Sequence, residues 1–204
     1  MSDRDEILRA VRNHAMMPVP RPELPDFADR YPATPEAFGV SLAIMGGIWD
    51  ESLINAPWDG SPADYAALSG YIRGLFPAGG VFCSAVRGID GDLAIGPDTP
   101  AAAVDHVEVG IVRARFGVAE TGSIWLSEAE CPVNALGYLA QHLVVLLSVK
   151  DILPNLHAAY RRAEFSTARY SVLMSGPSAT ADIEGVLIRG AQGVRSLRVI
   201  GLPG

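Results

Sequence analysis

Apolar residues along most of this chain fall into compact runs that predict short buried strands, separated by turns and helices. These runs lie at 81–86, 107–112, 116–119, 124–126, 142–147, 170–174 and 197–202. Strands that alternate with helices favour a mostly parallel sheet with helices on both faces. The pattern therefore predicts an α/β fold.

Helix starts are marked by capping residues that precede apolar positions at helical spacing. Ser2 or Asp3 can cap a short first helix, and Thr34 and Ser61 are each followed by proline, which suits the first helical position. Asp151 can cap a later helix that runs to 163. Between the first two helices, residues 18–25 hold four prolines in eight residues, which predicts an extended arm. The expected division is an N-terminal helix and arm, 1–33, followed by an α/β domain, 34–204.

The stretch from 175 to 195 begins with a Ser/Gly/Pro turn. The residues behind this turn are spaced so that they would share one face of a helix. The spaced residues are Ile183, Val186, Leu187 and Gly190. With the flanking strands, this predicts a βαβ unit whose turn brings backbone N–H groups and hydroxyls to a helix N-terminus, as in anion sites. The alternative is that Ser175, Ser178 and Thr180 only cap the helix.

A second turn with binding chemistry lies at 119–123, Ala-Glu-Thr-Gly-Ser. It joins a carboxylate and two hydroxyls to a glycine, which lets a ligand approach the main chain closely. The alternative is a hairpin turn with an exposed glutamate. Both turns adjoin strand ends, where ligands gather in α/β sheets, so we expect them to face one crevice. The predicted ligand-binding residues are Glu120, Thr121, Gly122, Ser123, Ser175, Gly176, Ser178, Thr180 and Asp182.

Charge and cysteine content narrow the classes of function. The chain has 204 residues, a net charge of −7 and a pI near 5.0, which argues against a nucleic-acid or anionic-membrane surface. No apolar run approaches the roughly 20 residues of a membrane-spanning helix. Cys83 and Cys131 form no CxxC pair and cannot supply four ligands, so neither an iron–sulfur cluster nor a metal site is expected in this chain. A cytoplasmic location with reduced thiols is expected.

Four motifs together resemble the LUD domain of the lactate utilization protein C family. They are the 119–123 turn, Ser-Gly-Pro-Ser at 175–178, Thr-Ala-Asp-Ile-Glu at 180–184, and Gly-Ala-Gln-Gly-Val-Arg-Ser-Leu at 190–197. The opening helix and proline-rich arm are also similar, so the resemblance covers nearly the whole chain and would make 34–204 the LUD domain. It implies a Rossmann-like fold of the NagB/RpiA/CoA-transferase type. It also implies a role beside iron–sulfur partner proteins in cytoplasmic oxidation of L-lactate to pyruvate.

This chain departs from the family at one point. The family commonly has His-Gly-Pro where Gln192, Gly193 and Val194 stand here. Glutamine keeps hydrogen-bonding capacity but cannot act as an acid or base near neutral pH. If the family histidine is catalytic, the activity of this chain would therefore be impaired or altered. If that histidine is structural, its replacement by Gln192 would change little.

Three functions are consistent with the sequence. The leading hypothesis is an accessory or ligand-binding subunit of a lactate-oxidising system, which binds a small anion and acts with iron–sulfur partners. No GxGxxG dinucleotide fingerprint is present, so the cofactor is unknown. The alternative is a standalone acyl- or CoA-transferase-like enzyme with Glu120 as the catalytic nucleophile. A third hypothesis is a non-catalytic interaction subunit.

Overall fold

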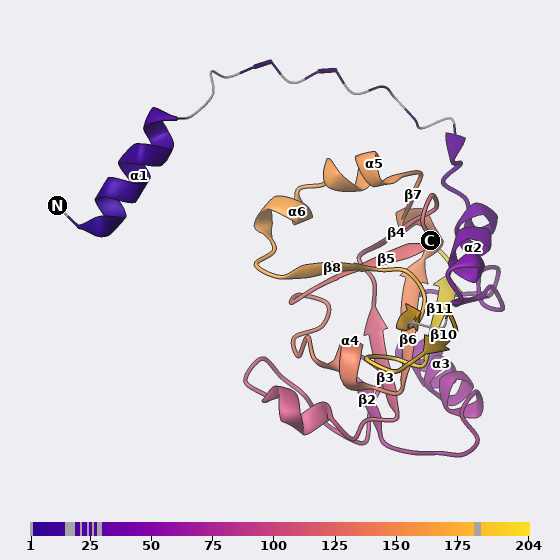
Figure 1. Cartoon of the computed structure of the whole chain (residues 1–204). Coiled ribbons are helices and arrows are strands. Elements are labelled where there is room, and N and C mark those ends of the chain that lie inside the picture. Colours follow the sequence, from indigo (N-terminus) through magenta and orange to yellow (C-terminus); the bar gives the residue numbers. More distant parts are fainter. Residues whose placement is uncertain are drawn as a thin grey trace.

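The computed structural model describes residues 2–14, 19–20, 22–23, 25, 27, 30–181 and 185–204 (Figure 1). Parts of the predicted proline-rich arm lie outside these residues, and so do Asp182, Ile183 and Glu184. The first helix, α1 (Asp3–Asn13), is capped by Ser2, whose side chain and that of Asp5 form a reciprocal capping box. None of the residues of α1 is buried.

The central sheet contains five parallel strands, which confirms the predicted α/β class. Their order across the sheet is β1 (Ile48–Asp50), β11 (Ser196–Leu202), β6 (His142–Ser148), β3 (Val109–Arg113) and β2 (Phe82–Ser84). The longest pair runs β6 against β11 over seven residues, from His142 opposite Ser196 to Ser148 opposite Leu202. Both faces of this pair are buried, which explains its nearly continuous apolar sequence.

Helices cover both faces of the central sheet, as predicted. On one face, α3 (Pro62–Gly74) packs Leu68 and Ile72 against alternate residues of β3, β6 and β11. On the other face lie α2 (Pro35–Ile44), α4 (Leu136–Leu139) and a second sheet, and the connection before β3 adds the 3₁₀ turn η2 (Ala101–Val104). Thr34 and Ser61 are the N-caps of α2 and α3, so both predicted helix starts are confirmed.

The second sheet is mixed and is absent from the sequence prediction. Its strands lie in the order β7 (Ile152–Leu153), β4 (Phe116–Val118), β5 (Ser123–Ser127) and β8 (Ser171–Met174). Its outer face packs Phe116 and Trp125, with ring centroids 5.3 Å apart, under α5 (Leu156–Tyr160) and α6 (Glu164–Thr167). The molecule is therefore layered as helix, parallel sheet, mixed sheet and short helices (Figure 1).

The helix predicted to start at Asp151 begins later and is shorter. Asp151 ends the 3₁₀ turn η3 (Val149–Asp151), after which the backbone pairs with β4 as strand β7. This pairing delays the helix until Asn155, whose Oδ1 accepts a hydrogen bond from the backbone N of Ala158 at 2.9 Å. Strand pairing therefore determines the start of α5.

The helix predicted behind Ser178 is wrong. The chain instead forms an antiparallel hairpin of β9 (Ala179–Ala181) and β10 (Leu187–Arg189), in which Thr180 pairs with Ile188. Gly185 and Gly190 adopt φ values of +72° and +77°, which a right-handed helix cannot contain. Leu187 is 58% exposed, whereas the helix prediction placed it on a buried face. The predicted βαβ unit and its helix N-terminus are therefore also wrong.

Among the described helices, none combines the length and the apolar character needed to cross a bilayer.

Candidate functional site

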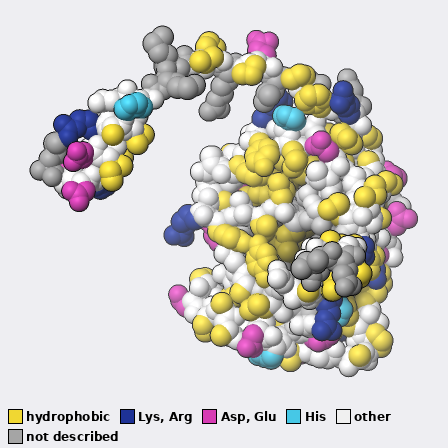
Figure 2. Space-filling model, in the orientation of Figure 1, with side chains coloured by type: hydrophobic (Ala, Val, Ile, Leu, Met, Phe, Trp, Pro, Cys, Tyr) yellow, Lys and Arg dark blue, Asp and Glu magenta, His cyan; other side chains and the backbone are white. Residues whose placement is uncertain are grey.

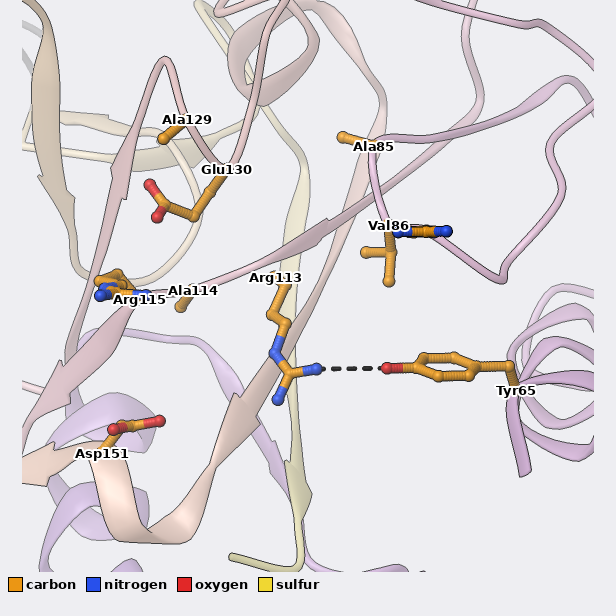
Figure 3. Close-up of a pocket in the computed structure, with 10 residues that line it drawn as sticks. Tyr65, Ala85, Val86, Arg113, Ala114, Arg115, Ala129, Glu130 and Asp151 are labelled. Atoms are coloured by element: carbon orange, nitrogen blue, oxygen red, sulfur yellow. Dashed lines mark hydrogen bonds between the residues drawn. The ribbon is translucent and has the colours of Figure 1, made fainter. Parts of the chain in front are cut away.

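The carboxyl ends of the parallel strands open onto a hollow of about 410 Å³ (Figure 3). Segments that follow β2, β3 and β6 contribute to it, together with the first turn of α3. We call it the arginine hollow. The polar side chains that line it are Tyr65, Arg87, Arg113, Arg115, Glu130 and Asp151. This edge is where ligands bind in open α/β sheets, because loops and helix N-termini converge there.

Two of the three arginines carry charges that are available to a ligand. Arg113 ends β3 and points out of the sheet, and its Nη1 donates to the hydroxyl of Tyr65 at 3.3 Å (Figure 3). Arg87 follows β2 and is exposed. Within the described part of the chain, no carboxylate lies within 4.0 Å of either guanidinium. Each guanidinium is therefore free of a carboxylate partner from the described residues and can pair with an incoming carboxylate or phosphate.

Arg115 is held at the border of the hollow by a carboxylate. Its Nε lies 3.2 Å from Glu164 Oε1, and Arg162 Nη2 lies 2.6 Å from the same oxygen. Hydrogen bonds from Arg162 above all, with a smaller contribution from Arg115, lower the pKa of Glu164 to about 2. Glu164 therefore stays ionised and fixes Arg115 beside the hollow.

Two carboxylates, Glu130 and Asp151, also line the hollow. Oε2 of Glu130 accepts a hydrogen bond from the backbone N of Ser127 at 3.1 Å and another from the Ser127 hydroxyl at 2.5 Å. Asp151 lies on the far side of Arg113 from Tyr65 (Figure 3). Guanidinium groups can bind the anionic end of a small ligand, while carboxylates can accept its hydroxyl or N–H donors.

Sequence reasoning missed Arg113 and Arg115 as binding residues. The available signal was their position directly after the predicted strand at 107–112, with Arg87 directly after the strand at 81–86. An arginine after one strand is common. It becomes informative only when the strand order is known, because β2 and β3 are neighbours in the sheet.

The two turns predicted to share a crevice lie side by side in the structure. The hydroxyl of Ser123 lies 2.6 Å from that of Thr121 and 2.5 Å from that of Ser175. Ser123 is only 3% exposed, so its hydroxyl is occupied within the protein. This chain of hydroxyls joins the start of β5 to the end of β8.

The glycines of these turns pack against α2. Gly122 and Gly176 have φ values of +61° and +75°. A Cβ at Gly122 would lie 2.2 Å from the backbone N of Leu42, and one at Gly176 would lie 2.3 Å from the carbonyl oxygen of Met45. Glycine is therefore required at both positions by the close approach of α2.

Beside α2, the turns line a hollow of about 320 Å³, which we call the α2 hollow. It is formed by Ser41, Ile44, Met45, Glu120, Thr121 and Ser175. Glu120 Oε2 accepts a hydrogen bond from the backbone N of Leu156 at 2.9 Å, at the first residue of α5. The C-terminal end of α2 and the carboxylate of Glu120 both disfavour an anion here. Binding of a small anion by these turns stays a prediction.

The remaining predicted residues lie in two places. Ser178 lines another hollow of about 320 Å³, together with Gln192 and apolar residues of β8. Figure 2 shows hydrophobic side chains gathered on this side of the molecule. The backbone N of Ser178 donates to Val194 O at 3.0 Å, which holds the 192–194 loop against the turn. Thr180 is exposed on β9, and Asp182 lies outside the described residues.

Comparison with known proteins supports this α/β fold. The crystal structure of a DUF162 family protein from Deinococcus radiodurans, at 1.70 Å resolution, superposes with a TM-score of 0.56. The superposition covers 82% of this chain and 94% of that one, at 18% identity. At this identity the likeness concerns the fold alone.

Sequence comparison matches the C-terminal half of the chain to a known protein family. The LUD domain family model matches residues 102–201, which include both turns, Arg113 and Arg115. The Escherichia coli (strain K12) protein YkgG, described as uncharacterized, is 30% identical over 96 residues, or 44% of this chain. That match spans 41% of the length of YkgG. The LUD domain resemblance found in the sequence is therefore confirmed over residues 102–201.

Proposed function

We propose that this LUD-domain protein is a ligand-binding subunit that holds a small organic anion in the arginine hollow. The observation that carries the proposal is the pair of arginines, Arg87 and Arg113, which face the carboxyl edge of the sheet without a carboxylate partner in the described part of the chain. On a chain with a net charge of −7, such a cluster concentrates positive potential at one place. A carboxylate or phosphate pairs with both guanidinium groups.

We further propose that the protein acts in the cytoplasm in L-lactate utilization, beside iron–sulfur partner proteins that oxidise lactate to pyruvate. The LUD domain match supports this assignment. The two cysteines, Cys83 and Cys131, are free and buried, and burial raises the pKa of Cys131 to about 11. A cysteine ligand of an iron–sulfur cluster must be a thiolate, and a raised pKa disfavours that form. This supports the proposal that the partner proteins carry the clusters.

A ligand titration tests the anion site. Pyruvate, L-lactate and inorganic phosphate are titrated calorimetrically into the full chain at constant ionic strength. Arg113→Met and Arg87→Met should each weaken binding about 10- to 100-fold, because each removes charge-assisted hydrogen bonds. Arg12→Met, on α1, is the matched control and should leave the affinity unchanged. Equal affinities in all four proteins would contradict the proposed site.

A co-purification experiment tests the accessory role. The chain is expressed with cysteine-rich iron–sulfur proteins of lactate utilization, and the complex is isolated through a tag on this chain. We expect the partners to co-purify and the isolated chain to show no L-lactate oxidation. Robust lactate oxidation by the isolated chain, without added cofactor, would overturn the accessory role.

We also propose that residues 34–204 form one LUD unit, larger than the matched range. The support is the packing of α2, whose Phe38 and Leu42 are fully buried in the core shared by both sheets. Limited proteolysis should yield a stable fragment that begins close to α2. A stable fragment that begins near residue 102 instead would contradict the proposed boundary.

A further inference from the structure

One side of α1 presents apolar side chains to solvent. Ile7 and Val11, four positions apart, lie on the same face of the helix and are each 63% exposed. Figure 2 shows hydrophobic side chains gathered along one side of this helix. An isolated helix of 11 residues is only marginally stable in water, even with the capping box of Ser2. An apolar surface that covers Ile7 and Val11 would stabilise α1.

A surface of matching chemistry lies on α2. Its inner side is buried through Phe38 and Leu42, whereas Val40, Ile44 and Met45 are 63%, 76% and 48% exposed. We call these three exposed residues the α2 face. Ile44 and Met45 also form the rim of the α2 hollow, which can receive an aliphatic side chain. This face and its adjoining hollow suit the hydrophobic side of a helix.

Charges next to the two surfaces are complementary. The first turn of α1 carries Asp3, Asp5 and Glu6 against one basic residue, Arg4, and is therefore net acidic. At the end of α2, the guanidinium of Arg189 lies over Gly46, where a Cβ would be only 2.4 Å from Arg189 Cζ. An acidic helix start that docks near Arg189 would therefore meet a positive charge, which favours one orientation of α1 on the α2 face.

We propose that α1 of one copy of this chain docks on the α2 face of a second copy. Within a single chain, α1 lies clear of both sheets and none of its residues is buried (Figure 1). Twenty-one residues, 14–34, separate α1 from α2. At about 3.1 Å per residue, a fully extended chain of 21 residues can reach roughly 65 Å, which is enough to reach a neighbouring molecule. Reciprocal exchange of the two helices closes a symmetric dimer.

The oligomeric state tests this docking. Light scattering after size exclusion, across a range of concentrations, should show a wild-type dimer that dissociates on dilution. Ile44→Asp, and the double variant Ile7→Asp with Val11→Asp, should raise the dimer dissociation constant at least about 100-fold. Val19→Asp is the matched control, since Val19 is 77% exposed in the arm, and it should dimerise like the wild type. A wild-type chain that stays monomeric, or dimers that persist in all variants, would overturn the proposal.

A cross-linking experiment identifies the copy that α1 contacts, and it does not depend on the aspartate variants. Val11→Cys is placed in one tagged chain and Ile44→Cys in a differently tagged chain, and the mixture is oxidised. We expect a disulfide between the two tags, and none when Val19→Cys replaces Val11→Cys. The exchange would be refuted if a chain that carries both Val11→Cys and Ile44→Cys formed only an internal disulfide. It would also be refuted if the α2 face bound an iron–sulfur partner and no second copy of this chain. The Arg113→Met variant should dimerise like the wild type. Loss of anion binding can therefore be distinguished from loss of the α1 docking.

Discussion

Arg198 on β11 donates through Nη1 to Oδ2 of Asp50 on β1, at 2.9 Å and 148 residues away in the sequence. The hydroxyl of Tyr71, on α3, donates to the same oxygen at 2.8 Å. Burial alone would raise the pKa of Asp50, but hydrogen bonds from Ser52, Tyr71 and Arg198 outweigh it and lower the pKa. This carboxylate therefore ties the edge strand β1 both to its neighbour strand and to α3.

Removal of this carboxylate should destabilise the fold. Asp50→Ala leaves Arg198 and Tyr71 without their shared acceptor, which should lower the free energy of unfolding by about 2 to 4 kcal/mol. The thermal midpoint should fall by about 4 to 16 °C, measured by circular dichroism. Glu51→Ala, at the exposed neighbouring position, is the control and should shift the midpoint little. Equal shifts in the two variants would show that the Asp50 contacts contribute no stability.

Glu164 should contribute stability that depends on pH. Its pKa falls from 4.5 to about 2 in the folded state, so its contribution is complete above about pH 4.5 and is lost as the pH falls towards 2. At pH 7, Glu164→Gln should lose about 1 to 2 kcal/mol, because solvent screens this partly exposed pair. The difference between wild type and variant in urea unfolding should shrink between pH 4.5 and 2. A difference that is constant over this range, or grows, would contradict the ion-pair explanation.

The sequence predicted elements that local chemistry determines. Thr34 and Ser61 start helices because hydroxyl caps followed by proline act within one turn. The buried strands at 142–147 and 197–202 were predictable because both faces of a parallel pair are buried, which leaves a continuous apolar run. The α/β class followed from the order of these elements along the chain.

Features that depend on distant pairing could not be predicted in this way. Residues 179–189 carry apolar positions at helical spacing, yet Thr180 pairs with Ile188 and positive φ at Gly185 excludes a helix. The mixed sheet depends on which strands become neighbours. The arginine hollow likewise requires the adjacency of β2 and β3, since Arg87 and Arg113 are far apart in sequence.

Gly122 should tolerate no side chain. Its φ of +61° and the 2.2 Å that would separate a Cβ from the backbone N of Leu42 combine strain with a clash against a rigid helix. Gly122→Ala should therefore lower the free energy of unfolding by at least about 3 kcal/mol, measured from urea midpoints. Gly70→Ala is the matched control inside α3, where an added Cβ would meet no atom within 4 Å, and it should stabilise the protein by about 0.5 to 1 kcal/mol. Similar midpoints for the two variants would contradict the packing role of Gly122.

Glu120 should act on α5 through its acceptor oxygen. Because Oε2 accepts from the backbone N of Leu156 at 2.9 Å, Glu120→Ala should lower the free energy of unfolding by about 1 kcal/mol. Glu120→Gln keeps an oxygen acceptor at this position, so it should lose about half as much. A covalent nucleophile behaves differently, since the amide that Glu120→Gln introduces cannot form an acyl intermediate even when stability is retained. Thermal unfolding and any acyl-CoA-dependent turnover are therefore measured on both variants, with Glu51→Gln as control. Turnover in the wild type that disappears in Glu120→Gln, at unchanged stability, would establish the transferase alternative and refute a purely structural role.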